Sequence, residues 1–156
     1  MKDKSRVVTA ATIRARQMMV GGLVGGHVVG AVVIAAAAIL GDAGAVLSAV
    51  LGFAAVIIFF AIGQWLEVIA CELDPVQGLG LAMVSYVVRV IGIGAGLWLI
   101  LSHPSVAPQV SGGWLLLSVT TTVFSWLAGV ILVASRQRVP VYDQEYVPPE
   151  TKKFRQ

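Results

Sequence analysis

The chain has 156 residues, of which 58% are hydrophobic and 12% are charged, and its formal net charge is +3. Soluble domains usually have about 25% charged residues, so this composition excludes an ordinary soluble domain and favours an integral membrane protein. The basic residues flank apolar stretches, a distribution that is typical of membrane topology and does not indicate nucleic-acid binding.

Four apolar stretches follow one another, and each has about the length that crosses the hydrocarbon core of a bilayer as a helix. They cover residues 18–40, 43–66, 78–101 and 114–135. Residues 1–17 form a basic segment before them. Residues 136–156 contain three prolines and mixed charge, so we expect a disordered tail. The sequence predicts an all-α membrane protein with four transmembrane helices and no separate soluble domain.

The connections between the stretches predict two helical hairpins. Gly41 and Asp42 alone join the first two stretches, which requires a tight turn. The gap at residues 67–77 is longer and acidic, and the gap at 102–113 is rich in proline and glycine. The acidic groups of the 67–77 gap match no metal motif, and a solvated loop is the plainer interpretation, although hard divalent cations do take oxygen ligands.

The basic residues predict the orientation. Ten of the eleven lie before the first stretch or after the last: Lys2, Lys4, Arg6, Arg14, Arg16, Arg136, Arg138, Lys152, Lys153 and Arg155. No Lys or Arg occurs in the gaps between stretches. By the positive-inside rule both termini are expected to be cytoplasmic, which requires an even number of spans.

Small residues recur at four-residue spacing in three stretches. Those in the first two are Gly22, Gly26, Gly30, Gly44, Ser48 and Gly52, and those in the third are Gly92 and Gly96. Small faces let membrane helices approach closely. Such faces indicate either packing within this bundle or, for one of them, contact with a helix of another protein.

Arg89 is the eleventh basic residue and stands inside an apolar stretch. Counting residues from the expected cytoplasmic ends places Arg89, His27 and Ser125 at a similar depth, about 15–17 Å into the membrane for the first two. An arginine at such depth is costly and often functional. The same count places Glu67 near the membrane surface, so no carboxylate of this chain is expected to reach Arg89. Backbone carbonyls, Ser125 and water could accept the hydrogen bonds of Arg89, or a carboxylate of a partner protein could balance its charge.

Several chemistries find no support in the sequence. There is one cysteine, Cys71, and there are two histidines, so neither an intrachain disulfide nor a multi-histidine metal site is possible. No phosphate-binding glycine loop or nucleophile elbow occurs. We therefore expect a non-enzymatic protein without a cofactor or a bound metal.

The layout resembles the ATP synthase protein I family. The strongest likeness is near the end of the chain, where Ser-Trp-Leu-Ala-Gly at 125–129 is followed by Arg136, Arg138 and the stretch Val-Pro-Val-Tyr-Asp at 139–143. The likeness extends loosely over residues 20–143 and points to the branch of high-GC bacteria. It implies a multi-pass protein of the bacterial cell membrane.

The resemblance also implies a function. Members of that family are thought to act as chaperones for the membrane sector of the F-type ATP synthase, helping its c subunits form a ring. A c subunit carries a mid-membrane carboxylate on a glycine-rich hairpin. Arg89 with Gly92 and Gly96, together with His27 and Ser125, would then be the partner-binding residues. Two other classes remain open: a small transporter or channel subunit with a polar path for ion transport at Arg89, His27 and Ser125, and a structural subunit of another membrane complex.

Overall fold

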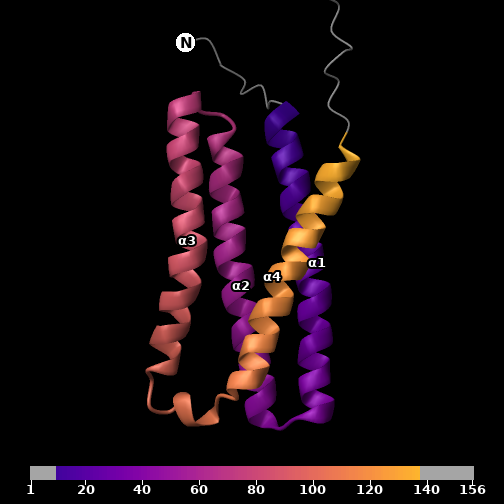
Figure 1. The fold of residues 1–156 in the computed structure, drawn as a ribbon, viewed down its shortest axis with the longest axis vertical. Helices are drawn as coiled ribbons and strands as arrows, with labels where there is room; N and C mark the ends of the chain where they lie inside the picture. Colours follow the sequence, from indigo (N-terminus) through magenta and orange to yellow (C-terminus); the bar gives the residue numbers. More distant parts are fainter. Residues whose placement is uncertain (1–9, 138–156) are drawn as a thin grey trace, which may run out of the picture.

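The computed structural model describes residues 10–137 as long helices joined by short connections (Figure 1). The elements are α1 (Ala10–Leu40), α2 (Ala43–Ala70), α3 (Pro75–Leu101), the 3₁₀ turn η1 (Ala107–Gln109) and α4 (Gly112–Arg136). Each of the four α-helices is long and apolar enough to cross a membrane. The prediction of an all-α protein with four membrane-length helices is confirmed. Most of the predicted tail, and residues 1–9 of the predicted basic segment, lie outside the described residues.

All four helices extend beyond the apolar stretches that predicted them, and α1 and α2 do so by the most residues. α1 begins at Ala10 rather than at residue 18, and α2 continues to Ala70 rather than ending at 66. An apolar window measures the part of a helix that suits hydrocarbon, whereas backbone hydrogen bonding continues through good helix formers such as arginine and glutamate. As a result Glu67, expected in a loop, lies within the last turns of α2.

α2 lies at the centre of the bundle, and α3 lies at its edge (Figure 1). α2 packs against α1, α3 and α4, and α1 also packs against α4. α3 packs extensively only against α2. Ser85 is the one residue of α3 that is fully buried. α3 is therefore the helix with the least support from the rest of the described bundle.

The interior is built from small side chains and one large ring. Trp126 of α4 is 1% exposed and lies over Gly22 and Gly26 of α1. Its ring meets the ring of Phe60 edge-on, with centroids 5.6 Å apart. Glycines at helix contacts let backbones approach closely, which is how membrane helices gain packing energy when lipid is as apolar as they are.

The chain alternates in direction, so that one end of the bundle collects four helix termini. α1 begins there, α2 ends there, α3 begins there and α4 ends there (Figure 1). The connection between α2 and α3, residues 71–74, therefore lies at the same end as the basic residues of α1 and α4.

Two aspartates cap the N-termini of helices, and we expect the two caps to stabilise the protein to different degrees. Asp42 Oδ1 accepts a hydrogen bond from Ala45 N at 2.8 Å, whereas Asp74 Oδ1 accepts from Gln77 N at 3.4 Å. We expect Asp42→Ala to lower the free energy of unfolding by about 1 kcal/mol, as loss of an N-cap does. Asp74→Ala should cost less, because its bond is long and Pro75 already favours the start of α3. Unfolding in detergent micelles, followed by circular dichroism, measures both; equal losses would contradict this order.

Candidate functional site

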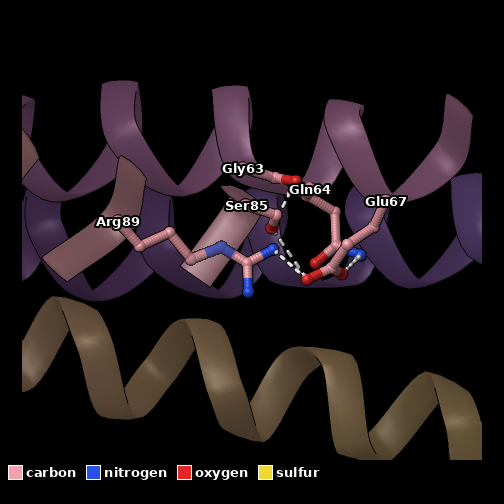
Figure 2. A network of polar contacts seen from close by, with 5 residues as sticks. All are labelled: Gly63, Gln64, Glu67, Ser85 and Arg89. Atoms are coloured by element: carbon pink, nitrogen blue, oxygen red, sulfur yellow. Dashed lines mark hydrogen bonds and ion pairs between the residues drawn. The ribbon is translucent and has the colours of Figure 1, made fainter. Parts of the chain in front are cut away.

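The centre of the candidate site is an ion pair between α2 and α3. Arg89 Nη2 lies 2.8 Å from Glu67 Oε1 (Figure 2). The two side chains are 18% and 33% exposed, respectively. Within the described residues this is the charge partner of Arg89. The prediction that no carboxylate of this chain reaches Arg89 is wrong.

Both oxygens of the Glu67 carboxylate have partners. Gln64 Nε2 donates to Oε2 at 2.7 Å. The buried hydroxyl of Ser85 lies 3.0 Å from Oε1 and 2.9 Å from the carbonyl oxygen of Gly63, and its single proton is available to either acceptor (Figure 2). Hydrogen bonds to a charged group are stronger than neutral ones, so this shell holds the carboxylate in place beside the guanidinium.

The pair forms because of the direction in which helical side chains lean. Every Cα–Cβ bond tilts toward the N-terminus of its own helix. α2 and α3 run in opposite directions, so Glu67 leans into the bundle while Arg89 leans toward the end where α3 begins. The depth estimated from the sequence applied to the Cα atoms and did not include the convergence of the two side chains. It also ended the second helix at residue 66, one residue before Glu67.

Two residues of α2 shape the space that the Arg89 side chain occupies. A Cβ at Gly63 would collide with Nε and Cγ of Arg89, so the glycine gives the side chain room to pass. The guanidinium carbon lies 5.5 Å from the centroid of the Phe60 ring, which favours a cation over its face. These contacts hold the side chain along α2.

A groove opens beside Arg89 between α3 and α4. It has a volume of about 470 Å³, and its walls are Phe60 of α2, Tyr86, Arg89, Val90 and Ile93 of α3, and Val123 and Leu127 of α4. Among the described residues, Nε of Arg89 has no hydrogen-bond acceptor, and Nη2 meets Glu67 at ion-pair distance without hydrogen-bond alignment. A guanidinium carries more donors than one carboxylate oxygen can use. Both nitrogens are buried, so they reach the groove only if the Arg89 side chain moves.

The other two polar residues predicted for the site have different neighbours. Ser125 Oγ donates to the carbonyl oxygen of Gly25 at 2.7 Å, which links α4 to α1. His27 is exposed; its Nδ1 lies 2.7 Å from the carbonyl oxygen of Leu23, and its ring meets that of Phe53 edge-on. Within the described bundle, Arg89, His27 and Ser125 form no hydrogen bond, ion pair or ring contact with one another. The polar path that the transporter alternative needs is not assembled from these three residues.

Most of the small residues singled out in the sequence lie at contacts between helices. Gly92 and Gly96 face the ring of Phe59 on α2, so a partner's helix would reach them only if α3 moved. Those of α1 and α2 meet the following groups: Gly22 and Gly26 the Trp126 ring, Gly30 the Phe53 ring, Gly44 the Gln109 carbonyl, Ser48 the Ser111 amide, and Gly52 the first turns of α4. The glycine faces are used for packing inside the chain.

Sequence reasoning missed Glu67, Ser85 and Gly63 as members of the site. One signal could have found them. Gly63 and Glu67 stand four residues apart on α2, as Ser85 and Arg89 do on α3, and residues at this spacing share a helix face. In an antiparallel pair joined by a short connection, such faces can meet.

The arrangement is suited to binding. Among residues 10–137, no three His, Cys, Asp or Glu side chains gather closely enough to hold a metal ion. What the geometry offers is a charged side chain, held by Glu67, in the wall of an otherwise apolar and aromatic groove. Comparisons with protein-family models, curated proteins and solved structures find no match to this chain, so the resemblance to ATP synthase protein I stays a prediction.

Proposed function

We propose that this protein is a non-enzymatic accessory or assembly factor for the membrane sector of the F-type ATP synthase, and that it binds a c-subunit helix in the groove between α3 and α4. The observation that carries the proposal is the presence of Arg89 in the wall of that groove. The family resemblance supplies the identity of the partner.

The groove and the partner are complementary in charge. A c-subunit helix brings a carboxylate at mid-membrane depth, where an unpaired charge is costly to either protein. The other wall residues of the groove are apolar or aromatic, so Arg89 is the group that would recognise the carboxylate. A guanidinium can bind a carboxylate through two parallel hydrogen bonds, which also fixes the orientation of the partner.

Glu67 then has a role before the partner arrives. It compensates the charge of Arg89 in the free protein, since an uncompensated arginine in hydrocarbon is unfavourable. When a partner's carboxylate enters the groove, Arg89 either leaves the Glu67 carboxylate for it or binds both carboxylates at once. Such an exchange preserves the compensation throughout, so the resting protein is stable and the site stays competent to bind.

The membrane setting belongs to the same proposal. We place the chain in the bacterial cell membrane as two hairpins with cytoplasmic termini. The collection of α1, α2, α3 and α4 termini at one end of the bundle, with Arg14, Arg16 and Arg136 there, supports that orientation.

Site-specific photo-crosslinking tests the docking surface. Val90 lines the groove, whereas its neighbour Ile91 does not, and both are exposed, at 56% and 61%. With the c subunit co-expressed, a photo-crosslinking amino acid at Val90 should capture it, and the same amino acid at Ile91 should capture little. Equal capture from both positions would contradict the proposed surface, and capture of a different membrane protein from Val90 would favour a structural subunit of another complex.

Substitution of the charged pair tests the recognition. We expect Arg89→Gln to reduce recovery of the c subunit about tenfold or more, because it removes one member of a desolvated charge pair. Measured relative to the amount of folded protein, Glu67→Gln should preserve or raise recovery of the c subunit, since it removes the competing anion. Arg14→Gln, a loss of charge near the start of α1 and outside this groove, is the matched control. If the Arg89→Gln variant inserts into the membrane and recovers the c subunit as well as the unchanged protein does, the proposed role of Arg89 is excluded.

A further inference from the structure

A second groove, with a volume of about 810 Å³, lies between α1 and α4 and has no part in the site described above. Its walls include the exposed apolar side chains of Val20, Val24 and Leu132. Arg16 and Gln17 are the polar residues that line it. The groove is thus apolar along most of its length and polar where α1 begins.

Glycines create this groove. Gly21 and Gly25 of α1 and Gly129 of α4 line it, and none has a side chain to fill it. They also let the backbones meet, since a Cβ at Gly25 would lie 2.7 Å from the carbonyl oxygen of Ser125. The hydrogen bond from Ser125 Oγ to Gly25 O ties the two helices together at the deeper end.

The length of the groove distinguishes between occupants. Along α1 it is lined from Ile13 to Gly25, a rise of about 18 Å. The hydrocarbon core of a bilayer is about 30 Å thick, so one leaflet contributes about 15 Å. A partner's membrane-spanning helix would need a surface across the whole core. The groove stays within one leaflet: beyond its polar residues it is lined from Val20 to Gly25, a rise of about 8 Å, which matches the upper part of an acyl chain.

The charge at its polar end indicates the headgroup. Arg16 leans toward the start of α1 and so toward the membrane surface, as long basic side chains do. Arg136 follows Leu132 by one turn on the same face of α4. α1 and α4 contain no aspartate or glutamate within their bounds. Two arginines without a nearby acid on their own helices favour a phosphate that carries net negative charge.

We propose that the groove between α1 and α4 binds one anionic phospholipid, with an acyl chain along Val20, Val24 and Gly25 and the phosphate at Arg16 and Arg136. This inference does not depend on the proposed function, because it uses a different face of the bundle and a different ligand. The bound lipid fills the space that the glycines leave and completes the packing of α1 against α4.

Native mass spectrometry of the purified full chain in mild detergent tests the proposal. The probes are phosphatidylglycerol, phosphatidylcholine with the same acyl chains, and glycerol phosphate without them. We expect one phosphatidylglycerol to be retained per chain, in preference to phosphatidylcholine and without competition from glycerol phosphate. Equal retention of both lipids, or displacement by glycerol phosphate, would overturn the proposal.

Two substitutions locate the site. Arg16→Gln should weaken phosphatidylglycerol binding roughly fivefold, the effect of one basic residue near an anionic lipid. Arg14→Gln removes the same charge from the same end of α1, but Arg14 does not line the groove, so binding should be unchanged. Val20→Trp should block the space for the acyl chain. If Val20→Trp does not fold, Val24→Phe is the alternative blocking variant. Equal effects of the two arginine substitutions, or full binding by the blocked variant, would refute the site.

Discussion

Glu67→Gln should destabilise the protein more than the double variant in which Arg89 is also replaced by glutamine. The single substitution leaves a guanidinium among apolar side chains with no anion beside it. Breaking a buried pair by removing one partner costs about 3 kcal/mol or more, whereas removing both can be nearly neutral. We expect a loss near the lower end of that range, because both side chains retain some exposure. Arg89→Gln alone should cost less than Glu67→Gln, since the Glu67 carboxylate keeps Gln64 and Ser85 as hydrogen-bond partners, whereas the guanidinium would keep no anion.

The measurement is unfolding of all three variants in detergent micelles, arranged as a double-mutant cycle. Glu72→Gln is the control, because it removes a charge of the same sign from the exposed connection after α2 and should shift the free energy of unfolding by less than about 0.5 kcal/mol. A double variant less stable than Glu67→Gln would show that the ion pair contributes little.

Gly129→Ala should separate α1 from α4, while Gly94→Ala should be tolerated. A Cβ at Gly129 would collide with the carbonyl oxygen of Gly21 and would lie 3.3 Å from Cα of Gly22. These are backbone atoms, so relief requires the helices to move apart. Overpacking of this kind costs about 1–3 kcal/mol. A Cβ at Gly94 has no neighbour within 4 Å in the described structure, so alanine there should be neutral or slightly stabilising.

Thermal unfolding in micelles compares these two glycine variants directly. The same chemical change is made in two membrane-length helices, so an effect of alanine on helix propensity is common to both. If the two variants unfolded at the same temperature, the close approach of α1 and α4 at Gly129 would not contribute to stability.

The helices were predictable because a bilayer allows few solutions. Apolar stretches of sufficient length must be helical, since lipid offers no partner for open backbone groups. The ends were less accurate. Ala10 and Ala70 lie beyond the apolar windows because hydrogen bonding continues where hydropathy falls. Asp42, between the first two stretches, correctly indicated the tight turn before α2, which it caps.

The candidate site was predictable only in part. Arg89 stood out because of its charge, and its cost in lipid required an explanation. Glu67 did not, because depth was counted between Cα atoms and an arginine side chain spans a full helical turn. Gly92 and Gly96 were identified as a smooth face, but periodicity does not say which neighbour covers it. That depends on the packing of α3 against Phe59, which no residue count contains.

The attachment of α3 to α2 alone also bears on how the chain enters the membrane during synthesis. Isolated, the stretch around Arg89 carries an insertion cost of about 2.5–3.5 kcal/mol for its arginine. α2 comes first in the chain, so Glu67, Gln64 and the gap at Gly63 are in place before α3 leaves the translocon. α3 therefore enters beside a helix that already holds its counter-ion. We therefore expect α2, which carries the counter-ion of Arg89, to favour the insertion of α3.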